Sequence, residues 1–343
     1  MSGRWPGGLI RKTAITPAGP FQDGAAKGVW TIMEAAYWIK QGLWPEAGNV
    51  APYGVFGGGF TGGNVNVIDR VIIATLGNAS DIGDLAQTAS EISAVSSSTR
   101  GVFSGRAGND TATFPMSYIT IANLGNSITF GEMLPSFNPT GPAGASNSVR
   151  GIFGGGDDGV TKNVIQYITI ASTGNAVDFG DLTQSRFYLA GCSSPTRALF
   201  AGGSTTSVTA TLVNTIDYVT IASTGNATDF GDLTASRNLL AASSSSTRGV
   251  FGGGYNVTNV VDYVTIATTG NATDFGDLTV ARNRLASCAS GTRSIFGGGY
   301  DGADNLNVID YITIATTGNA TDFGDLTVAR RALAGCSNAH GGL

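Results

Sequence analysis

The sequence is poor in charge, and this shortage excludes several classes of protein. Charged residues make up 13% of the 343 residues, against a usual ~25%, which argues against a coiled coil or a charge-rich helical array. The net charge of −5 argues against non-specific nucleic-acid binding, because that binding needs a basic surface. No apolar run approaches the ~18–20 residues of a membrane-spanning helix, and residues 1–30 lack the apolar stretch of a signal peptide. We therefore expect no nucleic-acid partner and no membrane insertion.

Groups that bind metals or carry out catalysis are also scarce. The chain has one histidine, His340, and no Cys or His pair at zinc-site spacing. The three cysteines, Cys192, Cys288 and Cys336, fall at equivalent places in a repeat where another copy has Ser243. We interpret them as small buried residues and not as disulfide partners. The sequence therefore predicts no metal, no cofactor and no enzymatic activity.

Glycine, in contrast, is abundant and periodic. The chain has 51 glycines among 343 residues, about twice the usual ~7%. An aliphatic-aromatic-glycine phrase such as Gly-Val-Phe-Gly-Gly-Gly recurs at intervals of 45 to 51 residues. Its six copies start at Gly54, Gly101, Gly151, Ala198, Gly249 and Ser294, and an arginine directly precedes each of the last five. Repeats of this length are typical of propellers and solenoids.

Each repeat has the pattern of four short strands. Residues 285–290 are an example of the first strand, and the Val-Phe run that ends in glycines is the second. Val260–Ala267 and Ala272–Leu278 are examples of the third and fourth strands. Alternation and β-branching favour strands, and Gly270-Asn271 suits a tight hairpin turn. Six four-stranded units fit the blades of an all-β, six-bladed β-propeller better than a helical solenoid.

The two ends of the array predict how the ring closes. The first copy, at Ala51–Gly59, lacks a preceding first strand, whereas residues 331–338 form a first strand with no blade after it. We predict that this C-terminal strand completes the first blade, since closure removes the exposed edges of an open array. The domains expected are an N-terminal attachment segment, 1–50, and the propeller, 51–343.

The repeats resemble kelch-type propellers. The residues that carry the resemblance are the glycines after Phe251, the Asp262-Tyr263 pair, Phe275 and Arg282. The chain has Phe275 where a kelch repeat usually has Trp, and Phe230 and Phe323 at the equivalent positions. Kelch enzymes of the galactose-oxidase type need a histidine-bearing copper site, which this sequence does not supply.

The chain also resembles repeat proteins of tailed bacteriophages, especially marine ones. The near-identical phrase Val-Thr-Ile-Ala-Thr-Thr-Gly-Asn-Ala-Thr-Asp-Phe-Gly-Asp-Leu-Thr carries this resemblance. The segment from Val29 to Pro45, with Trp30, Trp38 and Trp44, is similar to an element of phage fibres and appendage proteins. The resemblance implies a virion localisation and several copies per particle.

The N-terminal segment contains one predicted helix, at about residues 32–41. Thr31 and Glu34 form a capping box, and Gly42 and Pro45 end the helix. Four aromatic residues surround it: Trp30, Tyr37, Trp38 and Trp44. A helix this short is unstable alone, so these side chains must pack against something. Two interpretations stay open: docking onto another virion protein, or packing on the propeller as a plug.

A carboxylate recurs in a Gly-Asp-Leu motif. It is Asp84, Asp181, Asp232, Asp277 and Asp325, with Glu132 at the sixth site. We expect these carboxylates to form blade-to-blade ion pairs or to cap turns, because repeat symmetry gives like environments and catalytic pairs need unlike ones. The candidate partners for ion pairs are the recurring Arg186, Arg237, Arg282 and Arg330.

Variation among the copies concentrates in the connections between strands 2 and 3, and in one connection between strands 4 and 1. The candidate recognition loops are 107–113, 133–146, 157–162, 204–213 and 300–306. Their candidate ligand residues are Asn109, Asp110, Phe137, Asn138, Asp157, Asp158, Asp301 and Asp304. Polar loops on a rigid scaffold suit a host-surface glycan or protein. Asp157, Asp158, Asp301 and Asp304 could hold Ca²⁺ in their loops, but solvated loop charge is the favoured interpretation.

The leading hypothesis is a non-enzymatic virion protein of a tailed phage: a tail fibre, appendage or decoration. Residues 1–50 would anchor it to other virion proteins, and the variable face would contact the host surface or the particle. The main alternative is a cellular kelch-type adaptor that binds proteins. A carbohydrate-active propeller enzyme is disfavoured by the missing histidines and the symmetric carboxylates.

Overall fold

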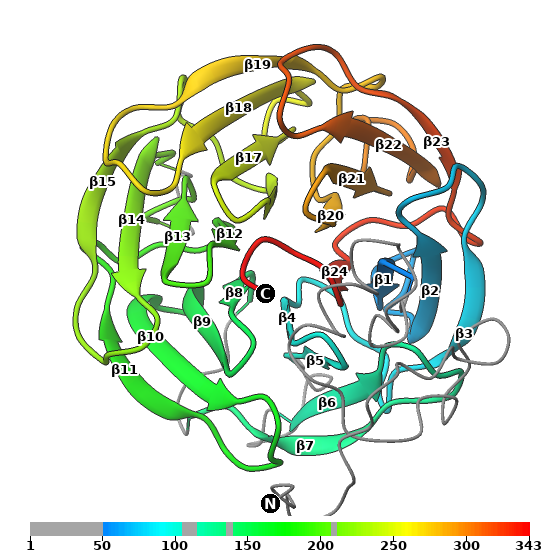
Figure 1. Cartoon of the computed structure of the whole chain (residues 1–343), viewed down its shortest axis with the longest axis horizontal. Coiled ribbons are helices and arrows are strands. Elements are labelled where there is room, and N and C mark those ends of the chain that lie inside the picture. Colours follow the sequence, from blue (N-terminus) through cyan, green and yellow to red (C-terminus); the bar gives the residue numbers. More distant parts are fainter. Residues whose placement is uncertain (1–50, 105–114, 135–139, 207–210) are drawn as a thin grey trace, which may run out of the picture. The chain divides into compact units, whose positions relative to one another are not determined.

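The protein forms a ring of six antiparallel sheets, each with four strands (Figure 1). The structure is a computed structural model that describes residues 51–104, 115–134, 140–206 and 211–343. These described residues contain no helix. The predicted six-bladed all-β propeller is therefore confirmed, and the helix predicted at 32–41 lies outside the described residues.

The strands follow one order in every blade, from the innermost to the outermost. Blade 1 contains β24 (Ala334–Ser337), β1 (Tyr53–Gly57), β2 (Val67–Ile72) and β3 (Ser80–Asp84). Blade 2 contains β4 (Ala94–Ser96), β5 (Arg100–Phe103), β6 (Pro115–Thr120) and β7 (Ile128–Glu132). Blade 3 contains β8 (Ala143–Ser146), β9 (Arg150–Asp157), β10 (Thr161–Thr169) and β11 (Val177–Asp181). Blade 4 contains β12 (Ala190–Ser193), β13 (Arg197–Ala201), β14 (Thr215–Thr220) and β15 (Thr228–Asp232). Blade 5 contains β16 (Ala241–Ser244), β17 (Arg248–Gly252), β18 (Val260–Thr265) and β19 (Thr273–Asp277). Blade 6 contains β20 (Ala286–Ala289), β21 (Arg293–Gly297), β22 (Val308–Thr313) and β23 (Thr321–Asp325).

The C-terminal strand closes the ring as predicted. β24 pairs with β1 in an antiparallel register from Gly54↔Ser337 to Gly57↔Ala334. Strands from the two ends of the described chain thus share one sheet, as the red and blue ribbons show (Figure 1). The pairing gives blade 1 the innermost strand that its own sequence lacks.

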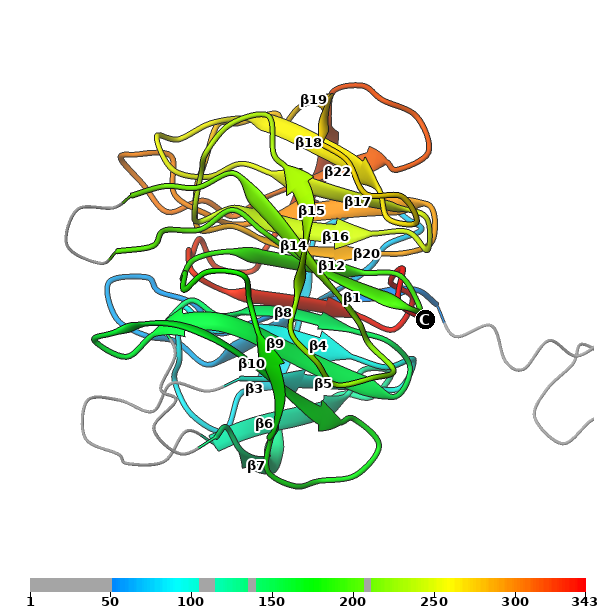
Figure 2. The same ribbon diagram turned by 90° about the vertical axis from the view of Figure 1, so that its left-hand side faces the viewer.

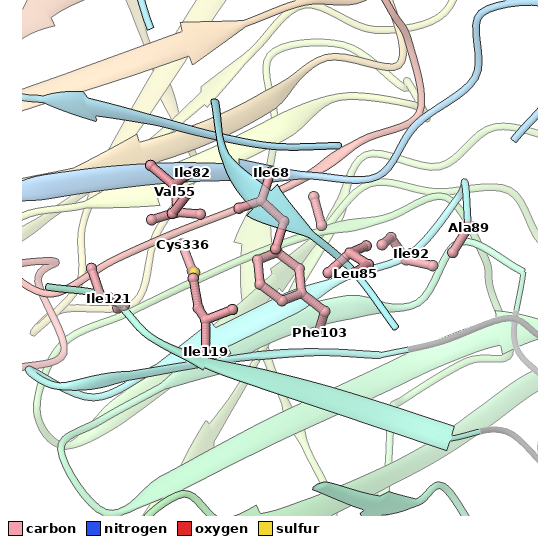
Figure 3. Packing of buried hydrophobic residues seen from close by; sticks show 11 residues of the cluster. Val55, Ile68, Ile82, Leu85, Ala89, Ile92, Phe103, Ile119, Ile121 and Cys336 are labelled. Carbon is pink, nitrogen blue, oxygen red and sulfur yellow. The ribbon is translucent and has the colours of Figure 1, made fainter. Parts of the chain in front are cut away.

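The hydrophobic core lies between neighbouring blades. One cluster joins Val55 and Ile68 of blade 1 to Phe103 and Ile119 of blade 2, with Cys336 of β24 beside them (Figure 3). Because each strand alternates its side chains between two faces, each blade presents one apolar face to each neighbour. The blades therefore depend on each other for burial, and a single blade has no complete core.

The glycine of the Asp-Phe-Gly-Asp motif, which is Asp81-Ile82-Gly83-Asp84 in blade 1, is required by close packing between blades. In blade 1 it is Gly83, with a φ of 143°, and a Cβ there would lie 2.6 Å from the backbone of Gly125 in the next blade's hairpin turn. That turn hydrogen-bonds to the neighbouring outer strand, through Gly125 N–H to Ile82 and through the Asn126 side chain to the amide of Asp84. The Gly-Asn turns thus link each outer strand to the following blade.

A second link runs through arginines stacked on tyrosines. In blade 2 the Arg100 guanidinium lies 4.2 Å from the centre of the Tyr118 ring and donates to the Ile170 carbonyl of blade 3 at 2.9 Å. Arg150, Arg197, Arg248 and Arg293 repeat the arrangement in blades 3 to 6. Blade 1 has the two residues exchanged between strands. There Arg70 on β2 stacks on Tyr53 of β1 and reaches the Ile121 carbonyl.

The recurring arginines do not pair with the Gly-Asp-Leu carboxylates, so the predicted ion pairs were wrong. Their partners are the aspartates of the third strand: Arg186–Asp217, Arg237–Asp262, Arg282–Asp310 and Arg330–Asp69, at 2.7–2.9 Å. The reason is that the chain turns inward after the outer strand, which carries each arginine into the middle of the next blade. The carboxylates expected as partners stay at the outer strand, where their backbone amides bind the Gly-Asn turns.

The side chains of these ion pairs are at most 4% exposed. The Arg186 and Asp217 side chains are both 0% exposed, and the guanidinium also donates to the Phe200, Gly202 and Thr215 carbonyls. Burial lowers the pKa of Arg186, and the adjacent carboxylate opposes that shift. A buried pair of this kind tolerates the loss of both partners far better than the loss of one.

Blade 2 lacks both members of this buried ion pair. Ser117 pairs with Phe103, as Asp217 pairs with Phe200 in blade 4, and Ala89 occupies the sequence position of the arginine. In blade 3 the aspartate is replaced by Gln166, whose side-chain oxygen accepts from Leu134 N–H at 2.9 Å. In blade 2 charge is thus absent from both positions, which avoids an uncompensated buried ion.

We expect Arg237→Ala to lower the free energy of unfolding by about 3–5 kcal/mol, because it leaves Asp262 buried and unpaired. Arg237→Ala with Asp262→Ser, which copies blade 2, should be less destabilised than the sum of the two single changes by about 1 kcal/mol or more. Denaturant unfolding of the four proteins measures this coupling. Strictly additive effects would contradict the assigned pair.

Deleting residues 331–343 should cause insolubility or a large fall in melting temperature, since blade 1 loses its innermost strand and two edges open. Deleting residues 339–343 is the matched control, because it keeps β24. Thermal melts of both proteins check this, and a longer deletion that melts like the full chain would refute ring closure.

Candidate functional site

The propeller has two unlike faces. The turn face carries the short connections between strands 1 and 2 and strands 3 and 4, such as 97–99 and 73–79. The loop face, at the other end of the strands, carries the connections between strands 2 and 3 and between blades; the side view shows both ends (Figure 2). The variable connections therefore share one face, as the antiparallel order predicts.

Several predicted ligand residues fall in these connections, and others lie outside the described residues. Asn109, Asp110, Phe137 and Asn138 lie outside them, as do Trp30, Tyr37, Trp38 and Trp44. Loop 107–113 is wholly outside, and loops 133–146 and 204–213 are described in part.

The carboxylates of Asp157, Asp158 and Asp301 bind groups of their own loops, and Asp304 takes part through its backbone. Asp157 accepts from Gly159 N–H and from the Thr161 hydroxyl, and Asp158 pairs with Lys162 at 3.0 Å. Asp301 accepts from Ala303 N–H and Asp304 N–H, and these hydrogen bonds lower its pKa. Among the described residues, no group of three or more His, Cys, Asp or Glu could hold a metal ion. These contacts stabilise the loops.

The innermost strands surround an axial channel. Small residues, among them Ala94, Gly144 and Gly191, line its middle, and a Cβ on Gly144 would lie 2.5 Å from the Ala94 carbonyl. The three cysteines sit at one register position of these strands and are buried and free, as predicted. Burial raises the pKa of Cys192 and of Cys336 to about 12, so these thiols stay protonated at neutral pH.

Serine hydroxyls form a relay around the channel at the turn face. Each donates to the carbonyl of the equivalent residue in the preceding blade: Ser96 to Ser337, Ser146 to Ser96, Ser193 to Ser146, Ser244 to Ser193 and Ser337 to Ala289. Blade 6 has Ala289 in place of the sixth serine and has no hydroxyl to give. The amide of Gly341 donates to the Ser244 carbonyl instead, at 2.9 Å.

The C-terminal residues thus close the channel at the turn face, with the C-terminus near the axis (Figure 1). Gly342 N–H donates to His340 Nδ1 at 3.1 Å, which places the imidazole proton on Nε2. Nε2 lies 3.0 Å from the Ser96 carbonyl and donates to it. The neutral ring satisfies both contacts, and a second proton would face the Gly342 amide.

At the loop face, six equivalent residues surround the mouth of the channel. They are Glu91, Gly141, Tyr188, Leu239, Arg284 and Ala332, one at the start of each innermost strand, all with φ between 53° and 62°. Each amide donates to the carbonyl of the preceding member, and Glu91 N–H donates to Ala332, so the circle is complete. A left-handed conformation is unusual for residues other than glycine, and this closed circle of hydrogen bonds holds five of them in it.

Three side chains of this mouth ring converge. The Tyr188 hydroxyl donates to Glu91 Oε1 at 2.7 Å, and Arg284 Nε lies 3.9 Å from the same oxygen. Tyr188 reaches past Gly141, where a Cβ would overlap its ring. In ring order the small Ala332 lies between Arg284 and Glu91. The two residues flanking Glu91 are thus small, and this leaves room for side chains from farther blades.

The mouth combines this polar trio with an apolar lining. A cavity of about 80 Å³ lies there, lined by the trio and by apolar residues that include Leu240, Leu285 and Leu333. Burial, followed by the Glu91 charge, raises the pKa of Tyr188. The phenol therefore stays protonated and acts as a hydrogen-bond donor.

The sequence reasoning missed this trio. The sequence patterns used were repeated carboxylates and long variable loops, whereas the mouth ring varies at one residue per blade, in connections that have the same length in five of the six blades. The signal was present: the residue before Leu-Ala is Tyr188, Leu239, Arg284 or Ala332 in the last four copies. That position differs among repeats whose neighbouring residues are nearly identical.

No family model matches this chain, and no curated protein matches it either. Within the described residues, no helix has the length and apolar character needed to cross a membrane.

The C-terminal closure should weaken as the pH falls. Burial lowers the pKa of His340 from 6.5 to about 4. Between pH 6.5 and pH 4, His340 binds a proton when the tail is released but not when the tail is docked. Docking is therefore strongest above pH 6.5 and is lost as the pH falls through 4.

His340 is the single histidine of the chain, so its imidazole proton NMR signal can be followed without variants. We expect an apparent pKa near 4 in the folded protein and near 6.5 in urea. A folded-state pKa near 6.5 would contradict the docked arrangement.

Proposed function

We propose that the protein is a non-enzymatic structural component of a tailed-phage particle, in which residues 1–50 attach it to other virion proteins and the propeller presents its loop face for recognition. The observation that carries the proposal is the division between the two faces. Near-identical turns and a docked C-terminus occupy the turn face, while the varied connections and the mouth ring occupy the loop face. This arrangement suits a rigid support that displays one recognition surface.

The chemistry of the mouth supports a binding role over catalysis. Glycoside hydrolysis usually needs two carboxyl groups on either side of the bond that breaks, and Glu91 is the one carboxylate among the described residues that line the mouth. Its neighbour Tyr188 is a protonated donor and not an activated nucleophile. Reproducible turnover of a glycoside, abolished by Glu91→Gln, would overturn the non-enzymatic assignment.

The virion role rests on the resemblance of the repeats and of the Trp30–Trp44 segment to tailed-phage proteins. The direct test is mass spectrometry and immunogold labelling of purified particles from the source of this sequence. A chain found only outside particles would refute the proposal.

Trp38→Ala and Trp44→Ala should reduce incorporation into particles while the melting temperature of the propeller stays nearly unchanged. Truncating a central interface aromatic typically costs ~2 kcal/mol or more in binding. Quantitative blotting of purified particles measures incorporation. Tyr255→Ala is the matched control, because Tyr255 is an aromatic residue of the propeller that is 43% exposed.

The same experiment separates docking from the alternative of an internal plug. Residues 51–343 expressed alone should fold with the full-length melting temperature if the segment serves attachment. Unfolding of that fragment, or of the two Trp variants, would identify the segment as part of the folded core.

A further inference from the structure

The mouth ring is where blade symmetry is broken most sharply. Neighbouring positions hold like residues in most blades, such as the leucines Leu189, Leu240, Leu285 and Leu333 that follow the ring residues. The ring itself holds an acid, a base, a phenol, an aliphatic side chain and two small residues. A purely structural seal could repeat one residue six times, so the asymmetry points to a ligand that is itself asymmetric.

The opposite charges of Glu91 and Arg284 cancel, and this favours a ligand without net charge. Glu91 and Arg284 lie against each other, and their side chains are 20% and 29% exposed. An anion would compete with Glu91 for the guanidinium, and a cation would compete with Arg284 for the carboxylate. A neutral ligand keeps the pair intact and avoids leaving a charge unpaired.

The trio also offers a hydrogen-bond acceptor beside a donor. A carboxylate has about four lone-pair sites and a guanidinium has five N–H donors, so both can bind a ligand in addition to each other. Neighbouring hydroxyls on one sugar ring match this pair, because one can donate to Glu91 while the other accepts from Arg284. Leu239 and the part-exposed Tyr188 ring add apolar surface for the C–H groups of the sugar.

We propose that the mouth of the channel binds the terminal unit of a neutral saccharide, with adjacent hydroxyls bridging Glu91 and Arg284 and with Tyr188 holding Glu91 in place. The inference deepens the proposed function and rests on it, since it gives the loop face a host-surface ligand class. The cavity of about 80 Å³ admits an edge of one sugar ring. Recognition of a longer chain then depends on the surrounding loops.

The test is saturation-transfer NMR on the full-length protein with three neutral probes and one acidic probe. The neutral probes are the methyl pyranosides of glucose, galactose and mannose, and the acidic probe is glucuronate. We expect saturable binding of at least one neutral probe in the millimolar range. Tyr188→Phe and Arg284→Lys should weaken it about tenfold, the size expected for losing one hydrogen bond to a charged group.

Asp325→Asn is the matched control, because Asp325 is a half-buried carboxylate at the outer strand β23, and it should bind like the unchanged protein. Glu91→Gln should abolish binding, with its fold checked by a thermal melt. No saturable binding of any neutral probe, equal binding by the mouth variants, or binding of glucuronate alone would overturn the saccharide site. Incorporation into particles should be unchanged in these variants, so failure here is distinguishable from failure of the proposed function.

Discussion

The structure depends on circular relays of hydrogen bonds that pass from blade to blade around the axis. At the turn face the serine hydroxyls donate to the preceding blade, and at the loop face the amides of the mouth ring do the same. The stacked arginines form a third relay at larger radius. No blade satisfies these groups alone, and an open array would leave unpaired polar groups and sheet edges at its ends. Closure by β24 is therefore what allows all three relays to form.

The exceptions to the repeat support this view, because they come in compensating sets. Tyr53 and Arg70 are exchanged between strands, and the stacked contact survives. Ala89 and Ser117 replace both members of a buried ion pair, and Gly341 supplies the donor that Ala289 lacks. A half-replaced buried pair leaves a desolvated charge, which explains why single exceptions are costly. Sequence changes among these near-identical repeats are thus constrained so that both members of a contacting pair change together.

The strands, their order and the closure could be predicted from sequence because they depend on local alternation, turn residues and counting of repeats. The arginine partners could not, since Arg186 and Asp217 meet through the inward path of the chain after the outer strand and not through spacing. The mouth trio was beyond reach for a similar reason. Glu91, Tyr188 and Arg284 are far apart in sequence and meet because alternate blades converge on the axis. The contact of the Gly341 amide with the Ser244 carbonyl depends on a single missing serine hydroxyl, at Ala289 in blade 6.

Repeat symmetry also limits where recognition can arise. Six near-identical blades produce six like environments, which suit packing but not the unlike groups that an asymmetric ligand requires. Changing a residue within the relays disturbs its neighbours on both sides. Side chains of the mouth ring are freer, because the ring bonds use backbone atoms alone and accept any residue that tolerates a positive φ. The mouth ring is thus both a position that the relays leave open to variation and a position where side chains from different blades can meet.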